Sequence, residues 1–200
     1  FDLWKMPDGR LGILVADASG HGLGPALVVS QARTLVRALA DYEPDPHAVL
    51  VRVNARLAED LDWGQFVTAF LGFLSTDGQL HWSSAGHGPM LVRRRPGGEL
   101  EDLDPPVQPL GVLPVWADGP PPPMQLEPGG QLILPTDGIF EASREDGEQL
   151  GVERMCRILD EHQHEPPEGL LAALRSAARA WSGKQEPLDD QTVVIVQREL

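Results

Sequence analysis

The amino-acid sequence predicts an α+β fold in which antiparallel strands form the centre and helices pack outside them. The first observation is the order of the expected elements: one strand, two helices, several strands, two helices and a final strand. The second is the middle of the chain, where short β-rich runs alternate with glycine-containing turns, as in an antiparallel meander. The third is the length, since 200 residues can bury roughly 70% of their unfolded surface. We therefore expect a single domain covering residues 1–200.

In the first third of the chain, one strand precedes two helices. Residues 10–16 are a short apolar run bounded by turn residues, which is typical of a buried strand. Residues 25–42 open on a proline and carry apolar side chains every three or four positions, as an amphipathic helix does. Residues 45–61 begin with an Asp-Pro pair that suits an N-cap and a first helical position, and they repeat the same periodicity.

The rest of the chain is divided by turn signals such as Asp77-Gly78 and Gly97-Gly98. Runs rich in β-branched and aromatic residues predict strands, and two later stretches return to helical periodicity. The expected elements are strands at 66–75, 79–86, 89–95 and 99–103, a proline-rich loop at 105–123, a strand at 131–134, helices at 151–162 and 167–181, and a strand at 192–196.

Composition excludes several classes of partner. The 16 Lys and Arg against 30 Asp and Glu give a net charge of -14, which repels nucleic-acid phosphates and anionic lipid headgroups. No apolar run approaches the roughly 20 residues that a transmembrane helix needs. Cys156 is the single cysteine, so no internal disulfide can form, and we expect a cytoplasmic protein. The chain begins at Phe1 without an initiator methionine, and we expect it to be truncated at its N-terminus.

Acidic residues stand at the ends of three apolar strands. Asp17 follows the first strand, Asp137 follows the strand at 131–134, and Asp189-Asp190 precede the last strand. If the fold brings these carboxylates together, their hard oxygen atoms would select Mg²⁺ or Mn²⁺. The alternative is that they are ordinary turn and cap residues on separate parts of the surface.

Four sequence blocks carry a resemblance to a known family. They are ADASGHGLGPAL, SSAGHGPMLV, PTDGIFEA followed by DGEQLG, and DDQTVVIV, and they occur in this order along almost the whole chain. This pattern resembles the PPM-type metal-dependent phosphatases, in particular their bacterial SpoIIE/RsbU-like branch. The resemblance implies an antiparallel β-sandwich flanked by α-helices, in α/β/β/α layers.

The resemblance also implies a site for two Mn²⁺ or Mg²⁺ ions. Asp17 matches the acid that bridges both ions, and Ala18 matches the position that offers a backbone carbonyl. Asp137 and Asp189 match further ligands, so that Asp17, Asp137 and Asp189 are the expected catalytic acids. Asp190 would lie near an ion without binding it directly. A further acid of the family pattern lies upstream of the stretch that Phe1 opens.

Gly138 is expected to let the backbone approach ions and phosphate closely. His21 could donate a proton to the leaving seryl oxygen, although hydrogen bonding within its loop is the competing role. Three other features are interpreted as structural: Arg93-Arg94-Arg95 as a solvated hairpin end, Trp63 as core or edge packing, and Cys156 as a small core residue.

By resemblance, the function is hydrolysis of phosphoserine or phosphothreonine on a regulatory protein by a water that the two metal ions activate. The usual substrate in this branch is a phosphorylated STAS-domain anti-sigma-factor antagonist, and dephosphorylation frees a sigma factor by partner switching. An upstream sensor domain is expected in the full-length protein, and homodimer formation is left open. One alternative is a catalytically weak or inactive module of the same fold that acts by protein binding. Another is a plain metal-binding or scaffold domain whose acids serve as caps.

Overall fold

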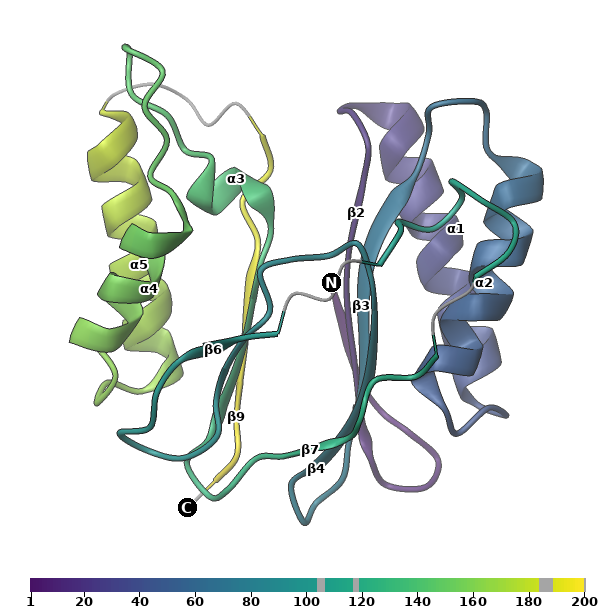
Figure 1. The fold of residues 1–200 in the computed structure, drawn as a ribbon, viewed down its shortest axis with the longest axis horizontal. Helices are drawn as coiled ribbons and strands as arrows, with labels where there is room; N and C mark the ends of the chain where they lie inside the picture. The colour runs from purple at the N-terminus through teal and green to yellow at the C-terminus, as the bar shows by residue number, and fades with distance from the viewer. Residues whose placement is uncertain (104–106, 117–118, 184–188, 200) are drawn as a thin grey trace. The chain divides into compact units, whose positions relative to one another are not determined.

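The computed structural model describes residues 1–103, 107–116, 119–183 and 189–199. It contains two compact units, one formed by Phe1–His87 and Pro105–Gln125 and the other by Gly88–Asp104 and Leu126–Leu200. Each unit consists of an antiparallel sheet with helices on it (Figure 1). The chain returns to the first unit before it completes the second, so neither unit is one continuous segment.

The first unit is a five-stranded antiparallel sheet covered by two long helices. In Figure 1, α1 and α2 lie along the same face of the sheet that contains β2 and β3. The strand order is β1 (Asp2–Lys5), β2 (Leu11–Ala18), β3 (Val67–Leu74), β4 (Gln79–Ala85) and β7 (Met124–Gln125), and the helices are α1 (Leu23–Ala40) and α2 (Pro46–Asp60).

Helix α2 begins where its sequence predicts. The side chain of Asp45 accepts a hydrogen bond of 3.0 Å from the backbone N–H of His47, which satisfies one of the free donors at the helix N-terminus. Its inner face, which includes Val49, Leu50 and Val53, joins residues of α1, β2 and β3 in one buried apolar cluster. Burial of this cluster fixes the sheet and the helices of the first unit as one body.

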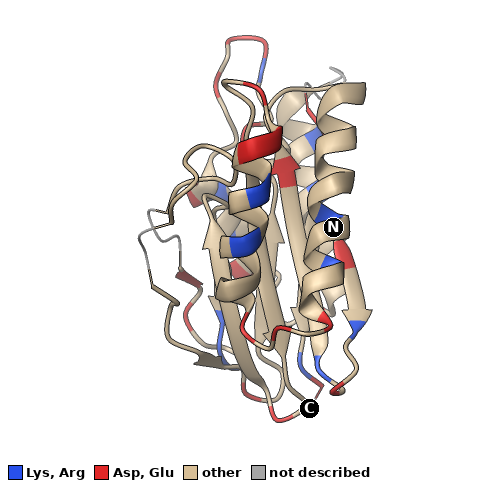
Figure 2. Ribbon diagram, turned by 90° about the vertical axis from the view of Figure 1, so that its right-hand side faces the viewer, with Lys and Arg blue, Asp and Glu red and all other residues tan. Residues whose placement is uncertain are grey.

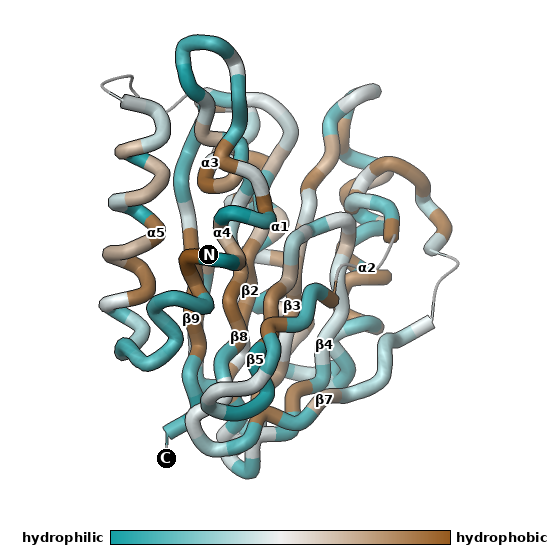
Figure 3. The backbone as a smooth tube through the Cα atoms, turned by 60° about the vertical axis from the view of Figure 1, so that its left-hand side comes forward, coloured by the Kyte–Doolittle hydropathy of each residue, from teal (hydrophilic) through white to brown (hydrophobic). Residues whose placement is uncertain are grey.

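The second unit is a four-stranded antiparallel sheet with three helices. Its core joins Leu91 and Ile133 on the sheet to Met155 and Leu159 on one helix and Leu170 on another. Figure 3 shows the corresponding hydrophobic stretches on β5 and β8. The strand order is β6 (Glu101–Asp102), β5 (Leu91–Arg93), β8 (Gln131–Pro135) and β9 (Val193–Gln197), and the helices are α3 (Asp137–Phe140), α4 (Val152–Glu161) and α5 (Pro167–Ser182).

The predicted α+β class with antiparallel sheets and outer helices is confirmed. Three short elements, β1, β7 and α3, were not predicted, because segments of two to four residues carry too little periodicity to be recognised from sequence. Helix α1 begins at Leu23, two residues before the proline that was expected to open it. The grouping of residues 1–200 into a single domain stays a prediction.

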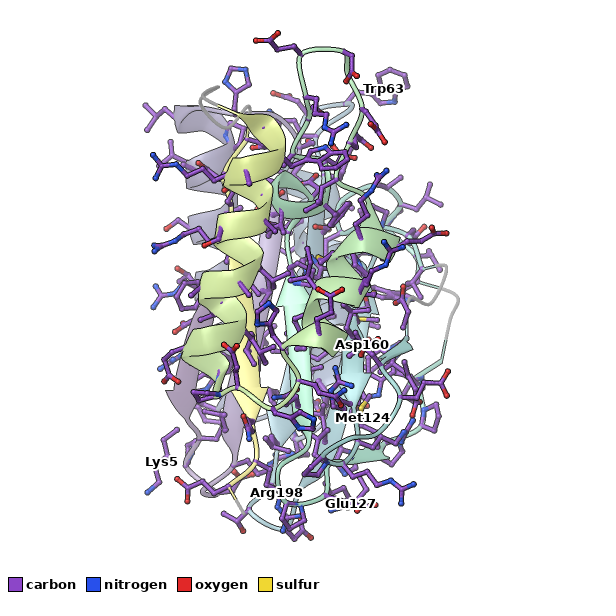
Figure 4. All side chains as sticks on the ribbon, turned by 90° about the vertical axis from the view of Figure 1, so that its left-hand side faces the viewer. Lys5, Trp63, Met124, Glu127, Asp160 and Arg198 are labelled. Atoms are coloured by element: carbon purple, nitrogen blue, oxygen red, sulfur yellow. The ribbon has the colours of Figure 1, made fainter. Side chains whose placement is uncertain are left out.

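Two expectations about individual side chains are wrong. Arg93 is not at a solvated hairpin end: its side chain is 2% exposed and forms an ion pair of 3.0 Å with Asp160, which is labelled in Figure 4. It also donates to the carbonyl of Leu159 in the last turn of α4, where the helix dipole favours a cation. Trp63 does not pack in a core. It lies fully exposed in the turn between α2 and β3 and projects from that turn in Figure 4.

Cys156 is packed against the core of the second unit, as expected, and burial raises the pKa of its thiol. Figure 2 shows that charged residues lie mainly on the helices and loops, while the strands are mostly uncharged. In the part of the chain that the structure describes, no helix has the length and apolar character that crossing a membrane requires. Cytoplasmic location stays a prediction.

We expect Gly12→Ala to destabilise the first unit. Gly12 pairs with Trp4 across β1 and β2, and a methyl group at this position would collide with the Trp4 indole ring. Overpacking of this kind costs about 1–3 kcal/mol of unfolding free energy, which urea denaturation would measure. Gly24→Ala is the matched control, because nothing lies within 4 Å of an added methyl group there. Equal stability of the two variants would contradict the packing described for Trp4.

Candidate active site

The end of β8 and the start of β9 are joined by hydrogen bonds that centre on Thr136. Its backbone N–H donates to the carbonyl of Thr192 at 2.9 Å, and its hydroxyl accepts from the N–H of Thr192 at 3.0 Å. The same hydroxyl lies 3.4 Å from the carbonyl of Asp190. Because Asp137 follows Thr136 and Asp189 precedes Asp190, these bonds hold two of the predicted acids at one end of the same strand pair.

Gly138 brings the two loops into direct contact. A methyl group at this position would overlap the carbonyl of Asp190 and lie 3.3 Å from the carbonyl of Asp189. Gln191 adds a side-chain bond across the same contact, from its amide nitrogen to the carbonyl of Gly138 at 2.9 Å. Only a residue without a side chain permits this approach of the two backbones. The expectation that Gly138 lets the backbone approach ions and phosphate stays a prediction.

Asp17 lies in the first unit. It is the last residue but one of β2, just before the glycine-rich loop. It pairs with Thr68 on β3, and its side chain is half-buried. The next ladder bond joins the N–H of Ser19 to the carbonyl of Phe66. Bonded and non-bonded pairs alternate in an antiparallel ladder, so the carbonyl of Ala18 points away from β3. Strand β1 pairs only with Leu11–Leu14, so no described strand uses that carbonyl.

The predicted acids are therefore divided between the two units. Asp137 and Asp189 are neighbours in the second unit, and Asp17 belongs to the first. Among the described residues, no group of three or more His, Cys, Asp or Glu side chains is placed so as to hold a metal ion. The donor chemistry nevertheless suits a hard divalent cation, because each candidate ligand is a carboxylate or carbonyl oxygen. The meeting of all three acids stays a prediction.

The remaining candidate residues are His21 and Asp190. His21 is exposed, and its side chain makes no hydrogen bond with any residue that the structure describes, so the expected loop hydrogen bond is not found. Asp190 is exposed, and its contribution to the contact with Thr136 and Gly138 comes from its backbone carbonyl.

His87 follows β4, and its surroundings indicate a structural role. It is 3% exposed, and its Nδ1 lies 3.5 Å from the hydroxyl of Thr68, which itself lies 3.5 Å from the carbonyl of Asp17. Its backbone N–H and carbonyl both bond the hydroxyl of Ser84. Burial lowers the pKa of His87 to about 4, so the ring is neutral near pH 7. The sequence analysis did not connect this residue with Thr68 and Asp17.

Comparison with known families gives the chain its classification. The family model described as Stage II sporulation protein E (SpoIIE) matches residues 7–199. The chain belongs to this family. The predicted resemblance to the SpoIIE/RsbU-like branch of the PPM phosphatases is confirmed by that match and by the relatives that follow.

Among curated proteins of this family, phosphoserine phosphatase RsbU of Bacillus subtilis is 24% identical over 191 residues, which are 95% of this chain and 56% of RsbU. A solved structure of the RsbU and RsbW domains of Rv1364c from Mycobacterium tuberculosis is 25% identical, with a TM-score of 0.82, and the match covers 100% of this chain and 54% of the other. RsbX in complex with magnesium gives a TM-score of 0.67 at 18% identity, covering 94% of this chain and 81% of RsbX.

These likenesses establish the fold, and they confirm the PPM phosphatase-like class that the SpoIIE-type sequence blocks predict. The chain spans little more than half the length of RsbU and of the Rv1364c structure. The activity, substrates and partners of those longer proteins therefore do not transfer to this chain as findings.

We expect Gly138→Ala to lower the unfolding free energy by about 1–3 kcal/mol, because the added methyl group must push apart the two loops that carry Asp137 and Asp189. Chemical denaturation followed by circular dichroism measures this. Gly119→Ala serves as the control, since an added methyl group meets nothing within 4 Å there. An unchanged stability in Gly138→Ala would mean that the loops do not touch as described.

The burial of His87 predicts how the unfolding free energy depends on pH. Its pKa is about 4 in the folded protein and 6.5 when unperturbed, so the unfolded chain binds an extra proton between these values. Stability is therefore unaffected by His87 above pH 6.5 and falls as the pH drops toward 4, by about 3 kcal/mol in total. In His87→Asn the slope of unfolding free energy against pH should be shallower over this range. An unchanged slope in His87→Asn would contradict the burial of a neutral ring.

Proposed function

We propose that this chain is a metal-dependent protein phosphatase domain that hydrolyses phosphoserine or phosphothreonine on a regulatory protein. The observation that carries the proposal is the set of hydrogen bonds and the backbone contact that join the loops of Asp137 and Asp189 at one end of β8 and β9. Membership of the SpoIIE family and the likeness to phosphoserine phosphatase RsbU support the same activity.

The residues that would hold two Mn²⁺ or Mg²⁺ ions are Asp17, Ala18 through its carbonyl, Asp137 and Asp189. Their oxygen atoms suit such ions, and a related structure, RsbX, contains magnesium. When bound, these ions would supply a nucleophilic water near neutral pH and positive charge for the phosphoryl oxygens. We infer that Asp17 joins the other two acids at this site.

The chain's own residues would then contribute by holding the metal-binding acids in place. Thr136 fixes the backbone from which Asp137 extends, and Gly138 allows the backbone of Asp189 and Asp190 to lie against it. Carboxylates alone would repel a phosphate, so the acids bind substrate only together with cations.

The substrate that we propose is a phosphorylated STAS-domain anti-sigma-factor antagonist, so that dephosphorylation would release a sigma factor by partner switching. The names of relatives support this context, since both RsbU and an RsbU–RsbW pair are among them. We further propose that the chain acts in the cytoplasm and that a sensor domain lies upstream of it in the full-length protein.

A second function is favoured by one observation. Among the residues with described positions, no group of three or more His, Cys, Asp or Glu side chains is placed so as to hold a metal ion. A module with an incomplete metal site would bind the phosphoprotein without hydrolysing it. Binding of a phosphorylated STAS protein with no phosphate release in the presence of Mn²⁺ would favour this alternative.

The phosphatase proposal predicts that hydrolysis of p-nitrophenyl phosphate requires Mn²⁺ or Mg²⁺ and stops when EDTA is added. Asp17→Asn and Asp137→Asn should each lower kcat/KM by at least about a thousandfold, because each removes a charged metal ligand. Circular dichroism should show that both variants keep their secondary structure.

Asp41→Asn is the matched control, since Asp41 is an exposed aspartate at the C-terminal end of α1 and should leave the rate unchanged. Metal-independent hydrolysis, or a rate in Asp17→Asn equal to that of the original protein, would exclude the proposed roles.

A further inference from the structure

A cavity lies beside the Asp137 and Asp189 loops and is formed entirely by the second unit. Its volume is about 330 Å³, which is near the lower end of the range for sites that bind small molecules or side chains. The lining residues come from α3, from α5, and from the start of β9 with the segment that leads into it. They are Ile139 on α3, Glu168, Leu171, Ala172 and Arg175 on α5, and Gln191 and Val193 at β9.

The cavity adjoins the loop that carries Asp137 and the segment that follows Asp189 and Asp190. Gln191, which forms part of its wall, donates to the carbonyl of Gly138 at 2.9 Å. Ile139, another part of the wall, is two residues beyond Asp137 in the same short helix. A polypeptide whose phosphoserine reaches Asp137 and Asp189 could therefore place its neighbouring residues near this cavity.

The lining combines an apolar surface with one guanidinium and one carboxylate. Leu171, Ile139 and Val193 give the cavity its mainly apolar character. Arg175 forms no ion pair or hydrogen bond with any residue in the described ranges, and its neighbour one turn further along α5 is another cation, Arg179. The one carboxylate of the lining, Glu168, lies in the first turn of α5, where the helix dipole already favours it.

We propose that this cavity selects the substrate by binding an apolar side chain together with an acidic side chain, both from the segment that flanks the phosphoserine. The apolar side chain fills the space beside Leu171 and Ile139, and the acidic side chain pairs with Arg175. This inference rests on the proposed phosphatase function and adds a preference for the sequence around the phosphorylated residue.

The test uses phosphoserine peptides that carry Leu-Glu at successive positions on either side of the phosphoserine. Each is paired with a peptide that has Ala-Lys at the same positions. The readout is kcat/KM for phosphate release from a peptide divided by kcat/KM for p-nitrophenyl phosphate, which does not reach the cavity. Fluorescence anisotropy of labelled peptides measures their binding independently of turnover.

At one position we expect the Leu-Glu peptide to exceed its Ala-Lys partner by about tenfold, the size of one charge-assisted contact. Arg175→Glu should remove or reverse this preference, and Ala172→Glu should weaken it by placing a carboxylate in the cavity. Ala172 is exposed, so its replacement does not disturb the core. Arg179→Glu, on the same helix but outside the cavity, is the matched control and should keep the preference.

The outcomes separate the inference from the function. Hydrolysis of p-nitrophenyl phosphate with no peptide preference at any position would overturn the inference and leave the phosphatase function standing. An equal loss in Arg179→Glu and Arg175→Glu would also overturn it, because the effect would then be one of general charge. Absence of any turnover, combined with a peptide-binding preference that Arg175→Glu removes, would overturn the function and support the cavity as a binding site.

Discussion

The contact between the loop after β8 and the loop before β9 is the constraint on which the site depends. Thr136 bonds Thr192 through both its backbone and its hydroxyl, and Gly138 lies against the carbonyl of Asp190. Two carboxylates placed near each other repel, so a sheet end must hold them by other bonds until a cation compensates their charge. The paired strands and these loop hydrogen bonds keep the two loops in place. The carboxylates themselves take no part in the strand pairing.

The proposed function requires an acidic protein to act on an anionic substrate. A net charge of -14 opposes phosphate binding over the surface as a whole, but divalent cations at the proposed site would reverse the field locally. In the proposed selection of peptides, further positive charge comes from the guanidinium of Arg175, which forms no ion pair or hydrogen bond with any residue that the structure describes. Elsewhere the arginines are used for structure: Arg93 is buried against α4 and pairs with Asp160.

Much of the fold could be predicted because its long elements have clear periodicity. Helix α2 begins at the expected Asp45 cap, and β9 lies within one residue of the expected strand. The short elements β1, β7 and α3 could not be predicted, since tertiary pairing and not local sequence defines them. Of the site, the neighbourhood of Asp137 and Asp189 followed from motif order. The burial of Arg93 and the exposure of Trp63 could not be predicted, because both depend on which way a side chain faces after the strands and turns have formed.

The central claim is that Asp17 joins Asp137 and Asp189 around divalent cations. A crystal structure of the protein with Mn²⁺, in which anomalous scattering locates the ions, tests it most directly. The account predicts anomalous peaks within coordination distance of all three carboxylates, with Asp17 shared between two ions. Manganese bound to Asp137 and Asp189 with Asp17 on a distant surface, or manganese found only at other residues, would contradict it.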